Sequence, residues 1–230
     1  MTDSAVILVS GGLDSAVCLW KGKEAGWRLY SISYNFYLRH SKEIEATEKL
    51  ARAAGVAEHR LVDLPFLREI KDTDLPRSNP LVALSDRIPS AYVPLRNTVF
   101  YAIACSWAES LGSRYVVGGH NAIDHSSFPD STPEYFDLLN RLLKVGSWIG
   151  RVQPIEVVTP LSRMNKAEIV KEAVRLGVPL ELTWSCYERG ERACGRCPAC
   201  AARLEAFAAT NIRDPIQYEP PELGTKGLNP

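Results

Sequence analysis

The 230-residue chain has no excess of charge of either sign, because 27 basic side chains are matched by 27 acidic ones. A balanced charge argues against binding to nucleic acid through bulk electrostatics, and it leaves nucleotide-sized ligands open. The chain also has no apolar run near the ~18 residues that a membrane-spanning helix needs. No basic segment precedes its first apolar run, so we expect no signal peptide and a soluble, cytoplasmic protein.

The chain also lacks the composition of a disordered or collagen-like protein, since hydrophobic residues make up 46% of it. That fraction is sufficient to bury a core. There are six cysteines, but a disulfide-stabilised scaffold would be shorter and secreted. Four of the six lie within fifteen residues near the C-terminus, which favours a metal site over scattered core thiols.

Apolar segments alternate with helical patterns along most of the chain. Residues 5–9 form a continuous β-branched run, which is typical of a strand buried on both faces of a parallel sheet. Further strands are expected at 28–34, 59–64 and 115–117, and helices at 15–24, 41–54, 97–111, 132–145 and 165–176. This alternation predicts an α/β fold, a doubly wound parallel sheet with helices on both faces.

The length suits one domain, which we place at residues 1–215 and which includes a small C-terminal lobe at about 183–210. Residues 216–230 are rich in proline and are expected to form an extended tail. Residues 72–94 contain four prolines and show no sustained period. A segment of this kind is either a lid beside the substrate or a surface excursion, and both interpretations remain open.

The string Ser-Gly-Gly-Leu-Asp-Ser at 10–15 stands where the first strand meets the first helix. Glycines there allow positive φ and a close approach of the backbone, and the N–H groups of a helix N-terminus favour an anion. Ser10 and Ser15 add hydroxyl donors. Asp14 would repel a bare phosphate, so we expect it to cap the helix or to meet Mg²⁺. The lysine of the Walker pattern and the G-x-G-x-x-G pattern are both absent.

This string after an N-terminal strand resembles the PP-loop of the adenylating ATP pyrophosphatases. Those enzymes cleave ATP between the α and β phosphates, hold the pyrophosphate in this loop and join AMP to an oxygen of the substrate. The resemblance implies ATP as co-substrate. The nucleotide-binding residues that it implies are Val9, Ser10, Gly11, Gly12, Leu13, Asp14, Ser15, Ala16, Val17, Cys18 and Leu19.

Cys186, Cys194, Cys197 and Cys200 have the spacing of metal ligands. Zinc favours four tetrahedral thiolates, and a closed site of this type is structural. An iron–sulfur cluster is the alternative, because Cys-x₂-Cys-x₂-Cys also occurs in ferredoxin-like runs. The spacing favours zinc. Cys18 and Cys105 lie on expected helices, where we interpret them as small buried hydrophobic residues.

Several further segments match one family when taken together with the loop and the cysteines. They are 92–97, 119–121 with Asp124, 128–130 with 133–134, 159–161 with Lys166, 183–187 and Arg203. Over nearly the whole chain, the combination resembles the 7-cyano-7-deazaguanine synthase family, also called QueC or ExsB. The Phe-Pro-Asp-x-Thr-Pro-Glu string at 128–134 is similar to the archaeal members.

The resemblance implies a ligase that converts 7-carboxy-7-deazaguanine and ammonia to the 7-nitrile through an adenylate and an amide. It implies structural Zn²⁺ on the four cysteines, ATP with Mg²⁺, and a place in queuosine or archaeosine modification of tRNA. The catalytic residues would be Asp14, Arg96 and Lys166, with the two cations on phosphate or carboxylate. The substrate-binding residues would be Arg96, Asn97, Asp124, Phe128 and Asp130.

Alternatives stay open at several of these positions. Asp124 and Asp130 suit a cap or a turn as well as the guanine edge, Phe128 suits the core, and His120 is either a proton shuttle or a structural histidine. The competing functions are another PP-loop adenylating enzyme such as a tRNA thiolase, a ligase that attaches a deazaguanine to a protein amine, and a non-enzymatic zinc module. A small deazapurine and ammonia are the expected partners, without nucleic acid or membrane. The oligomeric state is open, with a homodimer among the alternatives.

Overall fold

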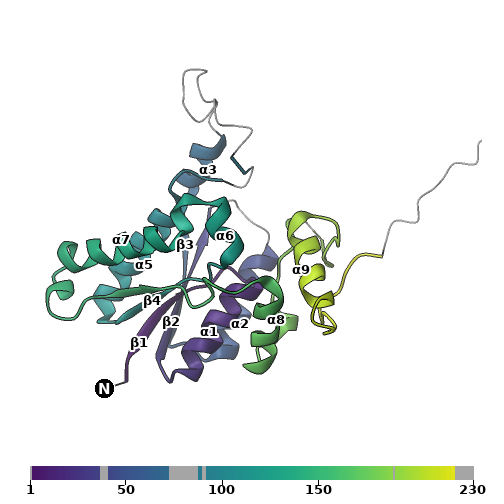
Figure 1. Cartoon of the computed structure of the whole chain (residues 1–230), viewed down its shortest axis with the longest axis horizontal. Helices are drawn as coiled ribbons and strands as arrows, with labels where there is room; N and C mark the ends of the chain where they lie inside the picture. The colour runs from purple at the N-terminus through teal and green to yellow at the C-terminus, as the bar shows by residue number, and fades with distance from the viewer. Residues whose placement is uncertain (1, 37–40, 73–87, 90–91, 189, 221–230) are drawn as a thin grey trace, which may run out of the picture.

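The computed structural model describes residues 2–36, 41–72, 88–89, 92–188 and 190–220. In these residues one sheet of parallel strands has the order β3-β2-β1-β4-β5 (Figure 1). The strands are β1 (Ser4–Leu8), β2 (Arg28–Asn35), β3 (Glu58–Asp63), β4 (Tyr115–Val117) and β5 (Glu156–Val158). The predicted parallel sheet is confirmed, and β5 is an addition that the sequence did not predict.

Helices cover both faces of this sheet (Figure 1). One face is packed by α1 (Leu13–Glu24), α2 (Ser41–Ala54) and α8 (Lys166–Arg175). The opposite face is packed by α5 (Arg96–Leu111) and α7 (Pro133–Gly146). Shorter helices are α3 (Pro65–Asp72), α6 (Ala122–Ser127) and α9 (Pro198–Ala208). The fold is therefore the doubly wound arrangement that the alternation of elements predicts.

The central strand β1 shows why its sequence is apolar without interruption. Ala5 and Ile7 belong to the core cluster under α1 and α8, whereas Val6 belongs to the cluster under α5, and all three are 0% exposed. Successive side chains of a strand point to opposite faces, so a strand covered on both sides needs an apolar residue at every position.

The direction of the chain across the sheet reverses beside β1. From β1 the chain moves outward through β2 and β3, and it then returns to β4 on the other side of β1. In open α/β sheets, ligands bind outside the carboxyl ends of the strands at such a switch point. Here the residues after β1 are the phosphate loop, and the residues after β4 are Gly118 and Gly119.

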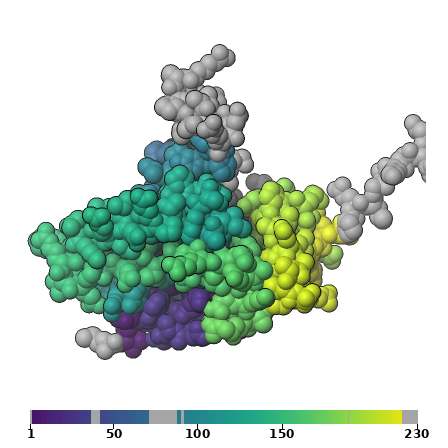
Figure 2. All heavy atoms as spheres, in the orientation of Figure 1, coloured from purple at the N-terminus to yellow at the C-terminus, as the bar shows by residue number. Residues whose placement is uncertain are grey.

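The C-terminal part of the chain forms a small lobe, residues 183–188 and 190–220, which we call the cysteine lobe. It contains α9 and lies against α8 at one side of the molecule, where it is yellow in Figures 1 and 2. Residues 216–220, the start of the expected extended tail, lie against this lobe. Ala193 N donates to Gln217 O at 2.9 Å, and Glu219 N donates to Ala193 O at 2.8 Å.

Some predictions fall outside the described residues. These are most of the segment expected as a lid or surface excursion, at 73–87 and 90–91, and the end of the tail, 221–230. Among the helices that the structure describes, none combines the length and the apolar character that crossing a membrane requires.

Candidate active site and metal centre

The two glycines of the phosphate loop have different roles. Gly11 has φ +82°, and a Cβ there would lie 2.8 Å from the Glu43 carbonyl oxygen, so this position needs glycine on two counts. Gly12 is the N-cap of α1 with φ −82°, and a Cβ there would make ordinary contacts of 3.6 Å or more. The expectation of positive φ is therefore confirmed at Gly11 and wrong at Gly12.

Hydrogen bonds within the loop hold its shape. The Ser15 hydroxyl donates to the Gly12 carbonyl at 2.9 Å and accepts from Ser10 N at 3.2 Å. The hydroxyl of Ser15 is thus engaged by the loop itself. Since the first four N–H groups of a helix have no partner within the helix, the start of α1 offers main-chain donors to an anion.

Asp14 does not cap α1, because it lies inside the first turn and the N-cap Gly12 has no side-chain cap. Its Oδ2 accepts from Lys166 Nζ at 2.5 Å and from Asn121 Nδ2 at 2.9 Å. Among the described residues, its Oδ1 is buried without a hydrogen-bond partner. A carboxylate oxygen of this kind at a phosphate site suits a hard cation such as Mg²⁺, the other expectation for this residue.

The residues expected to bind the nucleotide differ in the exposure of their side chains. Ala16, Val17, Cys18 and Leu19 are 0% exposed in the core under the sheet, and Leu13 is 6% exposed. Burial also raises the pKa of the Cys18 thiol. These side chains pack against the strands and the neighbouring helices, so contact with a nucleotide stays a prediction for them and would be made by the main chain. The pocket beside the loop is lined instead by Val9, Ser10, Asp14 and Ser15.

That pocket has a volume of about 300 Å³ and lies where β1, β2 and β4 end. One end is the phosphate loop. The other end is lined by a row of aromatic side chains and one cation: Tyr34, Phe36, Arg96, Phe100 and Phe128. The pocket therefore combines a cradle for anions with flat apolar walls, in one continuous space.

The aromatic end is tightly organised. Tyr34 and Phe100 are stacked with centroids 4.3 Å apart and planes at 4°. The Arg96 guanidinium carbon lies 5.7 Å from the Phe36 ring and 5.9 Å from the Phe128 ring. Aromatic faces with a guanidinium between them suit a planar ligand that carries negative charge. Sequence reasoning found Phe128 and Arg96 and missed the other three aromatic residues.

Arg96 stands where a cation is locally unfavourable, at the first position of α5, whose N-terminus carries partial positive charge. The preceding Leu95 is left-handed with φ +51°, a conformation that is uncommon for a leucine. Buried Asp130 compensates the helix end, since its carboxylate accepts from Asn97 N at 2.9 Å. Backbone strain held by neighbouring structure is typical of binding sites.

The two aspartates proposed for the base edge differ. Asp130 is 5% exposed, is not among the pocket-lining residues and accepts from Asn97 N at the start of α5, which agrees with the capping alternative. Contact with the substrate stays a prediction for Asp130. Asp124 lines the pocket, and its carboxylate also accepts from Asn121 N at 3.0 Å in the capping box of α6. Direct contact with a base therefore stays a prediction for Asp124.

His120 follows β4 and packs against the rings of Tyr101 and Phe136. Burial lowers its pKa to about 4, so the imidazole is neutral at neutral pH. The adjacent Gly119 allows a close approach to α1, because a Cβ there would lie 3.1 Å from Ser15 N. The ends of β1 and β4 are thus brought together at the loop.

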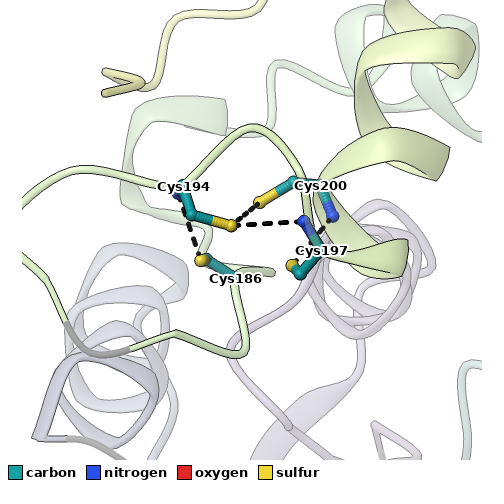
Figure 3. A group of neighbouring side chains, drawn as sticks. All are labelled: Cys186, Cys194, Cys197 and Cys200. Carbon is teal, nitrogen blue, oxygen red and sulfur yellow. Dashed lines mark hydrogen bonds between the residues drawn. The ribbon is translucent and has the colours of Figure 1, made fainter. Parts of the chain in front are cut away.

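The four clustered cysteines converge as predicted (Figure 3). Their Sγ atoms all lie within 4.8 Å of one another, all four side chains are buried, and every cysteine of the chain is a free thiol. Two of the four cysteines lie at the start of α9, where Cys197 is the N-cap and Cys200 lies in the first turn.

The surroundings of the sulfur atoms fit a metal ion. Glu188 N and Cys194 N each donate to Cys186 Sγ at 3.3 Å, and Cys197 N donates to Cys194 Sγ at 3.3 Å. Burial acts to raise the pKa of Cys194, but backbone N–H donors and hydrogen bonds from neighbouring thiols together outweigh it and lower that pKa to about 7. Four convergent thiols with donors aimed at them fit a closed tetrahedral site. The cluster can therefore bind a metal ion.

The sequence of the chain matches a known family. The family model described as "Queuosine biosynthesis protein QueC" matches residues 4–211. The chain belongs to the QueC family. The 7-cyano-7-deazaguanine synthase of Thermosynechococcus vestitus is 43% identical, with 94% of this chain and 96% of that protein covered. The synthase of the archaeon Thermoplasma acidophilum is 41% identical, with 94% and 92% covered.

Solved structures support the fold of this QueC-family chain. NMN synthetase from Francisella tularensis matches with a TM-score of 0.51 at 16% identity, covering 84% of this chain and 67% of that one. A 4-thiouridine synthetase in complex with RNA and ATP matches with a TM-score of 0.51 at 20% identity, covering 90% of this chain and 54% of that one. The doubly wound sheet is thus shared with these two synthetases, and identities of 16% and 20% support the fold alone.

Proposed function

We propose that this QueC-family chain is an ATP-dependent carbon–nitrogen ligase that converts 7-carboxy-7-deazaguanine and ammonia to 7-cyano-7-deazaguanine. The observation that carries the proposal is the continuous pocket, with the phosphate loop at one end and Arg96 between aromatic rings at the other. Such a pocket suits two anionic ligands held side by side, one with phosphates and one with a planar ring.

The chemistry requires that arrangement. A carboxylate and ammonia at neutral pH form a salt and go no further. Transfer of AMP from ATP to the carboxylate releases pyrophosphate and creates a leaving group, which ammonia displaces to give the amide and AMP. A second adenylation on the amide oxygen, followed by loss of AMP and a proton, leaves the nitrile. The protein contributes orientation, charge stabilisation and exclusion of water.

The residues divide between the two ligands. The loop residues Ser10 to Ser15 and the start of α1 would hold the phosphates. Arg96 would pair with the carboxylate of the deazapurine, whose ring would lie against Phe128, while Asn97 and Asp124 also line the pocket. Lys166, bound to Asp14, would keep that carboxylate oriented at the loop. Neutral His120 would take part as a hydrogen-bonding group at the reacting end.

Two metals belong to this proposal. Asp14 Oδ1 would hold Mg²⁺ beside the phosphates, where the ion supplies charge neutralisation. Cys186, Cys194, Cys197 and Cys200 would hold structural Zn²⁺, because the closed four-sulfur set leaves no position for a substrate.

The partners of the reaction would be a free small-molecule deazapurine and free ammonia, in the cytoplasm, on the route to queuosine or archaeosine. A homodimer is a further proposal, because α7 exposes an apolar row. Leu138, Leu142 and Val145 are 54%, 60% and 72% exposed. An exposed row of this kind is typical of an interface, and light scattering after size-exclusion chromatography would measure the mass.

The state of the two remaining cysteines argues against a tRNA thiolase, which would need a reactive thiol. Outside the metal centre the chain has Cys18 and Cys105, both buried. Burial raises the pKa of Cys18 and raises that of Cys105 to about 12. A thiol that stays protonated in the core cannot act as a nucleophile or carry a persulfide to RNA.

Nucleotide analysis tests the proposal. ATP should be consumed when 7-carboxy-7-deazaguanine is supplied, with AMP and pyrophosphate as products. Supplying the 7-amide in place of the acid should reduce the requirement from two ATP to one per nitrile. ATP consumption that is independent of the deazapurine would contradict the assignment.

A further inference from the structure

The cysteine lobe contacts the phosphate loop through the main chain of Trp184. The N–H of Trp184 donates to the carbonyl of Gly11 at 2.8 Å. The carbonyl oxygen of Trp184 lies 3.7 Å from the position that a Cβ on Gly12 would take. Trp184 is therefore seated against both glycines of the loop.

This hydrogen bond fixes the orientation of one peptide group. In a trans peptide, the C=O of Gly11 and the N–H of Gly12 point to opposite sides. With the Gly11 oxygen held by Trp184, the N–H of Gly12 points away from the cysteine lobe. Main-chain N–H groups that point to a common side at a helix N-terminus are what hold an anion there.

Trp184 is itself held from both sides. Its indole N–H donates to the carbonyl of Cys186, one of the four clustered cysteines, at 3.1 Å. On the other side, Arg203 donates to Thr183 Oγ1 at 2.8 Å. Arg203 forms an ion pair with Asp214 at 2.7 Å, and the two side chains are 3% and 5% exposed. The orientation of Trp184 thus depends on the cysteine centre and on a buried ion pair.

We propose that Trp184 is a positioning residue through which the cysteine lobe holds the phosphate loop in its anion-binding shape. The proposal rests on the phosphate-binding role proposed above. When Cys186 is not held in a metal site, the main chain at Trp184 loosens and the peptide between Gly11 and Gly12 is free to rotate. The cysteine centre therefore controls the affinity of the loop for pyrophosphate, although it touches no substrate.

A pair of variants isolates the N–H group. Trp184→Ala removes the indole and keeps the main-chain donor, whereas Trp184→Pro removes both. Thr183 has φ −84° and ψ 146°, which is a conformation that a following proline accepts. Titration calorimetry with Mg²⁺ and pyrophosphate should give a Kd about tenfold higher for Trp184→Pro than for Trp184→Ala. A change of about tenfold is what the loss of one hydrogen bond contributes. Elemental analysis should give equal metal contents for the two variants.

Hydrogen exchange on the wild-type chain is the second measurement, and it decides the matter if the proline variant does not fold. Removal of the metal by a chelator should speed exchange in a peptide that covers residues 9–19. A peptide from α7, which lies across the sheet, should exchange at its original rate and serves as the internal control.

Equal pyrophosphate affinities in the two variants, or unchanged exchange at residues 9–19 after chelation, would overturn the positioning role and leave the phosphate loop assigned. If the wild-type chain binds neither pyrophosphate nor ATP, the phosphate-binding role is wrong and the positioning role is overturned with it. The two failures are distinguished by whether they appear in the wild type.

Discussion

Lys166 Nζ and Asp14 Oδ2 lie 2.5 Å apart, and this contact joins the start of α8 to the start of α1 at the edge of the pocket. We expected Lys166 to contact phosphate or carboxylate of the ligands. In the structure, Lys166 is paired with the carboxylate of Asp14 in the loop. Asn121 donates to the same oxygen at 2.9 Å. The three residues come from three segments and form one hydrogen-bonded unit.

Disrupting this unit should affect turnover more than stability. Lys166→Met and Asp14→Asn should each lower kcat by at least about tenfold, because the charge at the phosphates is no longer held in place. The ion pair is partly exposed, so each change should cost no more than about 1 kcal/mol of unfolding free energy. Steady-state kinetics and denaturant unfolding measure the two effects.

The chain offers a matched control for this prediction. Lys21 and Glu172 also lie 2.5 Å apart and also join α1 to α8, away from the pocket. Lys21→Met should change stability by a similar amount and leave kcat unchanged. An equal loss of kcat in Lys21→Met and Lys166→Met would mean that the contact between the helices, rather than the pocket, is responsible.

The two loop glycines should respond differently to alanine. Gly11→Ala forces a left-handed alanine and a Cβ 2.8 Å from the Glu43 carbonyl, so it should lower the unfolding free energy by about 1–2 kcal/mol. Gly12→Ala meets neither problem and should stay within about 0.5 kcal/mol of the wild type. Thermal unfolding with and without pyrophosphate compares them, and equal behaviour of the two variants would refute the loop geometry.

The regular elements were predictable because their residues show their own periodicity. The strand at β1 and the helices α1, α2 and α5 have long apolar patterns, and the bounds of α2 agree at both ends. Strands β4 and β5 have three residues each, but only β4 is followed by a glycine pair that marks its end. Helix α6 has only six residues, and Asp124, which completes its capping box, also lines the pocket.

The sequence predicted the individual motifs of the site, but it did not predict which distant side chains contact one another. The loop string and the cysteine spacing carry their chemistry locally. The partner of Asp14, in contrast, lies 152 residues away, and the stacked pair Tyr34 and Phe100 lies 66 residues apart. Contacts of that separation depend on the order of the strands, which no local pattern contains.

The metal centre should contain about one Zn²⁺ per chain, bound by the four clustered cysteines. Chelation should lower the free energy of unfolding of the cysteine lobe and leave the sheet and its helices folded, because binding of the metal is coupled to folding of that lobe. Elemental analysis and chelator titration with circular dichroism measure these effects. A brown protein that contains iron would instead support the iron–sulfur alternative.

Buried His120 should make stability depend on pH. Its folded pKa of about 4 lies below the ordinary value of 6.5. Between these two pH values the imidazole is protonated in the unfolded chain and neutral in the folded chain. This contribution to stability is fully present above pH 6.5 and is lost as the pH falls toward 4. Histidine NMR should show one imidazole that stays neutral down to about pH 5 and that is missing in His120→Phe. Titration of that signal near 6.5 would contradict the assigned burial.

Mass spectrometry of the products tests the central claim most directly. The purified protein, incubated with 7-carboxy-7-deazaguanine, Mg-ATP and ammonium, should produce 7-cyano-7-deazaguanine through a transient 7-amide, with two AMP and two pyrophosphate per nitrile. The rate should rise with pH, because uncharged ammonia is the nucleophile. A mass shift on a protein acceptor without amide or nitrile, or ADP as the sole nucleotide product, would contradict the account.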